Sequence, residues 1–260
     1  MSSSTPSLPQ RLVVLAYGLV SYAIFFATFL YTVGFLGDFL VPRAIDGVPM
    51  HGPGFALLVN AGLLGLFALQ HSVMARPGFK AMLTRFIPEA AERSTYVLMS
   101  SLALIATFRW WEPMGGIVWQ VRSPLGSSLL LAGFAAGWLI VLAATFFINH
   151  FDLFGLRQVW TFFLRQNYAP LTFVTPGPYK LVRHPLYVGW ILTFWCTPNM
   201  TVAHLVFAVL TTVYILVAIQ FEERDLVAHH GVEYLEYRQR TPMLLPKLSG
   251  KAEPLASRRG

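Results

Sequence analysis

The sequence predicts an all-α fold, a polytopic integral membrane helical bundle with five or six transmembrane helices. Hydrophobic residues make up 55% of the 260-residue chain and charged residues only 12%, whereas soluble domains carry about 25% charged residues. Several apolar runs approach or exceed the roughly 20 residues that a helix needs to cross a bilayer. The basic residues lie mainly in alternate connections between these runs. Together these features exclude an ordinary soluble domain.

Five apolar regions define the expected helices. They cover residues 12–36, 55–74, 95–108, 125–148 and 186–220. The first is too long for the apolar core of a secretory signal, has one basic residue before it and no cleavage site after it, so we expect it to remain as a membrane anchor. The third is short and ends in Arg109-Trp110-Trp111, a possible interfacial anchor. The last is broken around Pro198, which predicts a hairpin with a half-length first limb and a spanning second limb.

The formal net charge of +7 could suggest nucleic-acid binding, but its distribution argues against it. Basic residues concentrate in segments 75–94 and 151–185 and in the tail after 220, and are sparse in the other loops. This alternation follows the positive-inside rule, so we expect the C-terminus to be cytoplasmic.

The sequence gives no support for a disulfide, a thiolate metal site or a glycine-rich nucleotide site. Cys196 is the single cysteine, which excludes an internal disulfide and a metal site built on thiolates, and we expect no metal. Glycine-rich nucleotide motifs are absent. We expect one domain over residues 1–260, with disorder at 1–10 and 249–260.

The string from Gly177 to Gly189 carries the densest polar chemistry. It reads Gly-Pro-Tyr-Lys-Leu-Val-Arg-His-Pro-Leu-Tyr-Val-Gly. Pro185 favours the first turn of a helix and disfavours helix before it, so the chain should enter the membrane just after His184. A positive anchor with interfacial tyrosines is the simpler alternative to a binding site.

A second polar cluster, Glu222-Glu223-Arg224-Asp225, follows the last apolar limb. Acids are disfavoured at a helix C-terminus, so we expect the helix to continue through Leu226. These carboxylates could hold a cationic ligand or pair with Arg183, or they could form a solvated face. Farther on, Tyr234, Tyr237 and Arg238 fall on one helical face, as a pocket wall or a surface lying on headgroups.

Polar residues also occur inside or beside other apolar runs. Asn60 and His71 fall on one face of the second run, where they mark either a site or an interhelical hydrogen bond. Gly133 and Gly137 form a small-residue notch for helix packing. His150 and Asp152 follow the fourth run at the same side of the membrane as the other clusters.

The paired clusters resemble the membrane methyltransferases typified by isoprenylcysteine carboxyl methyltransferase. The resemblance covers about 175–246 and rests on the Gly177–Gly189 string, on Glu222-Glu223 and on the following Gly-x-x-Tyr-x-x-Tyr. It implies a cytoplasmic-face site for S-adenosylmethionine in region 175–246. The implied cofactor-binding residues are Tyr179, Arg183, His184, Pro185, Leu186, Tyr187, Gly189, Glu222, Glu223, Tyr234, Tyr237 and Arg238.

Two upstream segments are similar to one bacterial branch of these enzymes, the methanethiol S-methyltransferases. They are residues 70–77, Gln-His-Ser-Val-Met-Ala-Arg-Pro, and 149–158, Asn-His-Phe-Asp-Leu-Phe-Gly-Leu-Arg-Gln. This similarity implies conversion of methanethiol, a small thiol, to dimethyl sulfide in a bacterial inner membrane. Phenylalanines at 146, 147, 151 and 154 and Trp160 could narrow the acceptor pocket, or could be lipid-facing or core residues.

Such a reaction needs the thiol to lose its proton. A cysteine thiol titrates near 8.5 and a simple alkyl thiol should titrate higher, so a base or cation should assist. The candidates are His184, His150, His71 and Asp152, and the sequence does not choose between them. Alternative functions are methylation of an isoprenylcysteine or lipid, reduction by a sterol-reductase-like enzyme using NADPH, and a non-catalytic scaffold.

Overall fold

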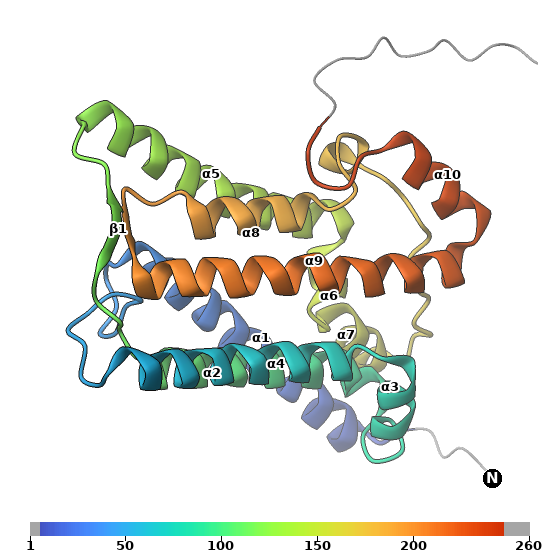
Figure 1. The fold of residues 1–260 in the computed structure, drawn as a ribbon. Helices are drawn as coiled ribbons and strands as arrows, with labels where there is room; N and C mark the ends of the chain where they lie inside the picture. The colour runs from blue at the N-terminus through green and yellow to red at the C-terminus, as the bar shows by residue number, and fades with distance from the viewer. Residues whose placement is uncertain (1–5, 247–260) are drawn as a thin grey trace, which may run out of the picture.

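The computed structural model describes residues 6–246 as a bundle of helices that run back and forth between two ends (Figure 1). Six segments form its body: α1 (Leu8–Gly37), α2 (Pro53–Met74), α4 (Glu92–Trp110), α5 (Pro124–Ile148), α8 (Pro185–Trp195) and α9 (Val202–His230). The short elements α3 (Pro77–Leu83), η1 (Glu89–Ala91), α6 (His150–Leu153), α7 (Leu156–Phe163), η2 (Gly177–Lys180) and α10 (Val232–Arg240) belong to the connections at one end. We call this end, on the right in Figure 1, the polar end.

The predicted membrane bundle is confirmed. Within the described residues, α1, α2, α5 and α9 are long and apolar enough to cross a membrane. The other two body segments bring the total to six, within the five or six expected: α4 has 19 residues and packs along α1 and α2, and α8 is the expected half-length limb of 11 residues. Helix α9 runs through Leu226 to His230, so Glu222 and Glu223 lie within a helix, as expected.

The first helix begins earlier than we expected. Ser7 caps it, because its side chain accepts from the backbone N–H of Gln10 and the Gln10 side chain accepts from the Ser7 backbone N–H. The prediction of disorder was therefore wrong for residues 8–10, where this capping box starts the helix. The predicted disorder at 1–5 and at 249–260 lies outside the described residues.

A small sheet departs from the all-α prediction. Strand β1 (Ile117–Gln120) pairs antiparallel with β2 (Asn199–Thr201), at the end of the bundle opposite the polar end. The backbone N–H of Val121 also donates to the carbonyl of Pro198. The turn between α8 and α9 is therefore tied to the segment that precedes α5.

Helices α5 and α8 approach closely through glycine. A Cβ on Gly137 would lie 2.9 Å from the carbonyl oxygen of Gly189 and 2.8 Å from Cγ2 of Thr193. A Cβ on Gly189 would lie 2.8 Å from the carbonyl oxygen of Gly137. The predicted packing notch is confirmed, and it fixes the helix that carries the Arg-His-Pro string.

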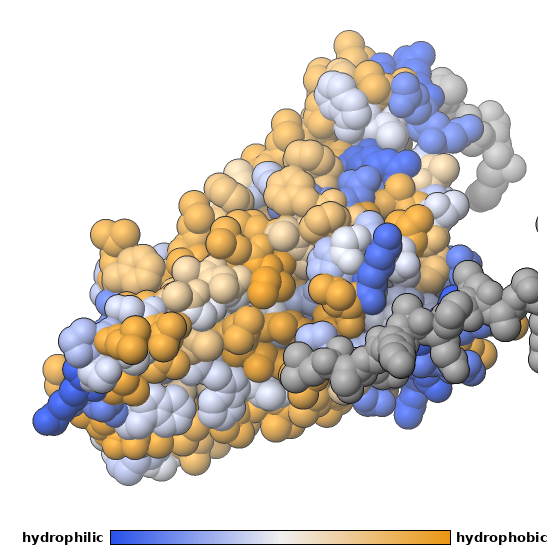
Figure 2. Space-filling model, turned by 90° about the horizontal axis from the view of Figure 1, so that it is seen from above, coloured by the Kyte–Doolittle hydropathy of each residue, from blue (hydrophilic) through white to orange (hydrophobic). Residues whose placement is uncertain are grey.

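The outer surface is largely apolar, as in a protein that lies in lipid. Leu58 of α2, Leu129 of α5 and Val13 of α1 are 72%, 64% and 68% exposed. Figure 2 shows hydrophobic side chains over most of the visible face, with hydrophilic residues mainly near the two ends. The chain is an integral membrane protein.

Candidate active site

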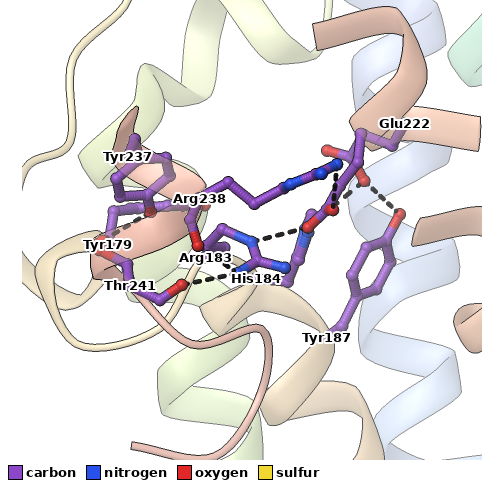
Figure 3. A network of polar contacts seen from close by, with 9 residues as sticks. Tyr179, Arg183, His184, Tyr187, Glu222, Tyr237, Arg238 and Thr241 are labelled. Atoms are coloured by element: carbon purple, nitrogen blue, oxygen red, sulfur yellow. Dashed lines mark hydrogen bonds and ion pairs between the residues drawn. The ribbon is translucent and has the colours of Figure 1, made fainter. Parts of the chain in front are cut away.

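The start of α8 and the end of α9 meet in an ion-paired cluster at the polar end (Figure 3). Nε of Arg183 lies 2.7 Å from Oε1 of Glu223, and Nε2 of His184 lies 3.1 Å from the same oxygen. The side chains of all three residues are at most 11% exposed. Because Pro185 begins α8, the chain turns at His184 and presents the Arg183 and His184 side chains to α9.

Arg183 also fastens the segment that follows α10. Its Nη1 donates to the backbone carbonyls of Arg238 and Thr241, at 3.1 and 2.6 Å. The backbone N–H groups of Arg183 and His184 donate to the carbonyls of Pro242 and Met243. The guanidinium is thus held by a carboxylate and two carbonyls, and it connects α8, α9 and the end of α10.

The two neighbouring carboxylates differ in exposure. The side chain of Glu223 is 10% exposed and receives the ion pairs, whereas that of Glu222 is 45% exposed. Oε2 of Glu222 accepts from the hydroxyl of Tyr187 at 3.0 Å and lies 3.8 Å from Nδ1 of His184. A carboxylate has about four acceptor positions, so Glu222 keeps acceptor capacity for a ligand.

Aromatic residues of α10 form one wall beside this cluster. The hydroxyl of Tyr237 donates to the backbone carbonyl of Tyr179 at 2.6 Å, and burial raises the pKa of Tyr237 to about 12. Tyr234 is 1% exposed, and burial raises its pKa as well. Its buried hydroxyl has no hydrogen-bond partner among the described residues, and its ring lies 5.8 Å from that of Tyr237.

A shallow cavity of about 310 Å³ adjoins this wall. Its lining includes Phe173, Lys180, Tyr237 and Arg240. The Phe173 ring lies 5.8 Å from that of Tyr234 and 5.6 Å from that of Tyr237. The sequence did not single out Phe173, because a lone aromatic in a connecting segment has no pattern that distinguishes it.

The structure gathers most of the residues implied by the resemblance. Tyr179, Arg183, His184, Tyr187, Glu222, Glu223, Tyr234, Tyr237 and Arg238 form one neighbourhood. Three others lie elsewhere. Pro185 is fully buried at the start of α8, and Leu186 packs against the hydrophobic core. Gly189 faces α5, where its missing Cβ permits helix contact, and its place on the pocket wall stays a prediction.

His150 belongs to a different network. Its Nδ1 lies 2.9 Å from the hydroxyl of Thr145, and its Nε2 lies 2.8 Å from the hydroxyl of Tyr22. Because Thr145 donates its hydroxyl hydrogen to the carbonyl of Leu142, Nδ1 must donate and Nε2 must accept. Burial lowers the pKa of His150, and the ring stacks on Phe146. The imidazole is therefore held neutral with both nitrogens occupied.

Asp152 is engaged in a local network as well. Its Oδ1 accepts from Nη1 of Arg157 and from the hydroxyl of Tyr168, each at 3.0 Å. The amide of Gln158 donates to the Asp152 backbone carbonyl at 3.1 Å. These contacts hold the connection after α6 in shape.

His71 lies between α2 and α4. Its Nε2 is 2.7 Å from the hydroxyl of Tyr96, and its Nδ1 is 3.1 Å from that of Ser100. Tyr214 of α9 lies beside the same ring, with centroids 6.5 Å apart. The sequence did not point to Tyr96 or Tyr214, since tyrosines within apolar runs look like ordinary packing residues.

The structure bears on two alternatives that the sequence left open. Asn60 pairs with the backbone just after α4 rather than with another helix: its amide donates to the carbonyl of Glu112 at 2.8 Å, and its carbonyl accepts from the Glu112 N–H at 2.9 Å. The aromatics expected to narrow the acceptor pocket mostly face outward: Phe146, Phe147, Phe151 and Trp160 are between 47% and 59% exposed, and Phe154 stacks on Phe25. This exposure fits the lipid-facing alternative, and the narrowing of an acceptor pocket stays a prediction.

Comparisons with known proteins identify the family of this chain. A family model described as phospholipid methyltransferase matches residues 126–231. The methanethiol S-methyltransferase of Crocosphaera subtropica is 55% identical, covering 94% of this chain and 95% of the relative. Methanethiol S-methyltransferase 2 of Bradyrhizobium diazoefficiens is 52% identical over 92% of both chains, and the enzyme of Mycobacterium tuberculosis is 49% identical over 91% of this chain and 97% of its own. No solved structure matches. With such identity over nearly the whole length, the chain belongs to the methanethiol S-methyltransferase family of membrane methyltransferases.

Proposed function

We propose that the protein transfers a methyl group from S-adenosylmethionine to methanethiol, producing dimethyl sulfide, at the polar end of the bundle. The observation that carries the proposal is the half-exposed carboxylate of Glu222 beside the buried Arg183–His184–Glu223 cluster. Membership of the family supports the same activity, because the named relatives are methanethiol S-methyltransferases.

The residues present fit this methyl donor. Glu222 offers a carboxylate with free acceptor positions toward a cationic ligand, and the buried Tyr234 hydroxyl lacks a partner that a polar ligand would provide. Tyr179, Tyr237 and Phe173 supply aromatic surface beside both groups. When bound, S-adenosylmethionine supplies an electrophilic methyl group on a sulfonium.

The chain itself must then orient the acceptor and release its proton. One S–C bond forms as the donor's S–CH₃ bond breaks, and the products are the sulfide, the demethylated donor and one proton. The apolar helices exclude water from the reacting groups, and alignment of the two reactants lowers the barrier further. Buried Glu223 fixes Arg183 and His184, which leaves Glu222 as the exposed member of the acidic pair.

We infer that the site faces the cytoplasm of the bacterial inner membrane. Basic residues at the polar end are Arg11, Arg76, Lys80, Arg85, Arg93, Arg157, Arg165, Lys180, Arg183, Arg224, Arg238 and Arg240. The opposite end carries only Arg43, Arg109 and Arg122 among the described residues. This asymmetry supports a cytoplasmic polar end under the positive-inside rule. A cysteine introduced into α10 tests the orientation, through its labelling by a membrane-impermeant thiol reagent added from one side of the membrane.

Calorimetry on detergent-purified protein tests the donor site. S-adenosylhomocysteine should bind and NADPH should not. Glu222→Ala, Glu223→Ala and His184→Ala should each weaken binding, since losing a charged hydrogen-bond partner typically costs about 1.5–3 kcal/mol. Wild-type affinity in all three variants would overturn the placement, and NADPH binding in place of S-adenosylhomocysteine would favour a reductase.

Headspace gas chromatography tests the acceptor. Cells that express the protein and receive methanethiol should release dimethyl sulfide, and the Glu222→Ala strain should release less. Methylation of farnesylcysteine or of a phospholipid without methylation of methanethiol would refute the substrate and leave the donor site intact.

A further inference from the structure

A group of hydroxyls lies just inside the bundle from Glu222, and the chemistry described above does not use it. It consists of Tyr96 of α4, Tyr187 of α8, and Tyr214 and its partner Ser72 from α9 and α2; we call it the hydroxyl cluster. The Tyr214 and Ser72 hydroxyls are 3.3 Å apart. The Tyr96 hydroxyl lies 2.7 Å from Nε2 of His71, whose ring centroid is 6.5 Å from that of Tyr214. The Tyr187 hydroxyl donates to Glu222 at 3.0 Å.

The positions of these residues along their helices place most of them near the polar end. Tyr96 is in the second turn of α4 and Tyr187 in the first turn of α8, both helices starting at the polar end. His71 is three residues before the end of α2, which finishes at the same end. Tyr214 lies eight residues before Glu222, or about 12 Å along α9 at 1.5 Å per residue. Helices α2, α4 and α9 thus bring polar groups together, and Tyr187 of α8 contacts Glu222 farther along α9.

All three tyrosines are half-buried, so they are neither sealed in the core nor open to bulk solvent. Hydroxyl groups inside a membrane bundle are costly unless they have partners, and they often mark function. A small thiol is weakly polar and partitions into apolar surroundings. It fits a region that offers a few hydroxyls within an apolar wall such as Phe67, whose ring stacks on His71 at 5.2 Å.

His71 fixes the orientation of Tyr96. Nε2 of His71 is 2.7 Å from the Tyr96 hydroxyl, and Nδ1 is 3.1 Å from Ser100, which also accepts weakly from Gln70 at 3.4 Å. When Tyr96 donates to Nε2, its oxygen lone pairs face away from the imidazole. They are then available to accept a hydrogen bond from an S–H group.

We propose that the hydroxyl cluster is the acceptor site, in which Tyr96 contacts the thiol and His71 positions Tyr96. This inference rests on the proposed function and assigns its substrate pocket. As the new S–CH₃ bond forms, the S–H bond breaks and its electron pair stays on sulfur. The proton passes to the carboxylate of Glu222, which Tyr187 contacts and whose 45% exposed side chain releases it to water.

Steady-state kinetics of the full-length protein in detergent, with methanethiol and S-adenosylmethionine varied separately, tests the assignment. Tyr96→Phe removes one hydroxyl, and we expect kcat/KM for methanethiol to fall about fivefold to tenfold, as for a lost hydrogen bond. The Kd for S-adenosylhomocysteine should stay within about twofold. Tyr31→Phe is the matched control, because Tyr31 donates to the carbonyl of Arg43 at the opposite end.

Two His71 variants separate positioning from simple packing. A glutamine amide reaches the place of Nε2 and can still contact Tyr96, whereas an asparagine amide reaches only the place of Nδ1 and contacts Ser100. His71→Gln should therefore keep more activity than His71→Asn, and His71→Asn should add little to the defect of Tyr96→Phe in the double variant. Equal losses in the two variants, or additive losses in the double variant, would overturn the positioning role.

The outcomes distinguish this inference from the proposed function. If the wild type forms no dimethyl sulfide, the proposed function fails. If it does, and Tyr96→Phe has the kinetics of Tyr31→Phe, the hydroxyl cluster is not the acceptor site. If Tyr96→Phe weakens S-adenosylhomocysteine binding as much as turnover, Tyr96 serves the donor and the assignment is equally wrong.

Discussion

Arg183 and Glu223 form a 2.7 Å ion pair between the residue two positions before α8 and the last part of α9, with both side chains about nine-tenths buried. The two residues are 40 positions apart in the sequence. Around this pair the structure arranges His184, the exposed Glu222 and the backbone of the segment after α10. The pair therefore connects the stability of the polar end to the geometry of the proposed donor site.

Glu223→Gln should destabilise the protein far more than Glu222→Gln. Removing one partner of a buried pair leaves an uncompensated charge and typically costs about 3–5 kcal/mol. Glu222 is 45% exposed, and an exposed ionic contact contributes about 1 kcal/mol or less. Thermal unfolding in detergent, followed by tryptophan fluorescence, compares the two variants. Equal shifts in Tm would show that Glu223 does not support the fold more than Glu222 does.

The glycine contact between α5 and α8 should be intolerant of a methyl group. Gly137→Ala would place Cβ within 3 Å of the Gly189 carbonyl and of Thr193, and overpacking of this kind costs about 1–3 kcal/mol. Because α8 carries Tyr187 and follows His184, we also expect weaker binding of S-adenosylhomocysteine.

Gly62→Ala is the matched control, since a Cβ there meets no atom within 4 Å. Alanine is favoured over glycine in a helix by roughly 0.5–1 kcal/mol, so this variant should be as stable as wild type or slightly more so. If Gly137→Ala and Gly62→Ala unfold at the same temperature, the close approach of α5 and α8 does not limit stability.

The sequence predicted the helices well because membrane spans leave a strong signal. Runs 55–74 and 125–148 nearly coincide with α2 and α5, since lipid requires continuous apolar sequence and internal backbone pairing. The ion pair of Arg183 with Glu223 could be predicted from the sequence. Arg183 lies just before α8 begins and Glu223 lies near the end of α9, and these two points are at the same end of the bundle.

What could not be predicted depends on tertiary contact. The pairing of β1 with β2 joins residues about 80 positions apart, and three or four residues carry too little pattern to predict a strand. The contact of Tyr96 with His71 needs the mutual rotation of α2 and α4, which hydropathy does not specify. Gly189 had a place in the recognised string, but only its contact with Gly137 shows that it serves packing.

Protein stability should depend on the protonation of His150. Burial lowers its pKa, so the unfolded chain, in which histidine titrates near 6.5, binds a proton more readily than the folded protein. The contribution of the neutral ring is then fully present above about pH 6.5 and is lost as the pH falls below that value toward the lower folded pKa. His150→Asn should flatten this part of the Tm-versus-pH curve, measured in parallel with wild type. An unchanged slope would show that another group controls acid stability.

The pH dependence of activity should not require His150 or Asp152. Both nitrogens of His150 are occupied by Thr145 and Tyr22, and the Asp152 carboxylate is engaged by Arg157 and Tyr168. His150→Asn and Asp152→Asn should therefore lower the amount of folded protein while the remaining enzyme keeps the wild-type pH profile for kcat.

Loss of Glu222, the group to which we assign the acceptor proton, should reduce kcat across the whole range. The measurement is dimethyl sulfide formation from about pH 5.5 to 9 at saturating substrates, normalised to the number of S-adenosylhomocysteine sites, because a histidine base would produce a rise near 6.5. A displaced midpoint in His150→Asn would identify that imidazole as the base, and would mean that its contacts with Tyr22 and Thr145 open during turnover.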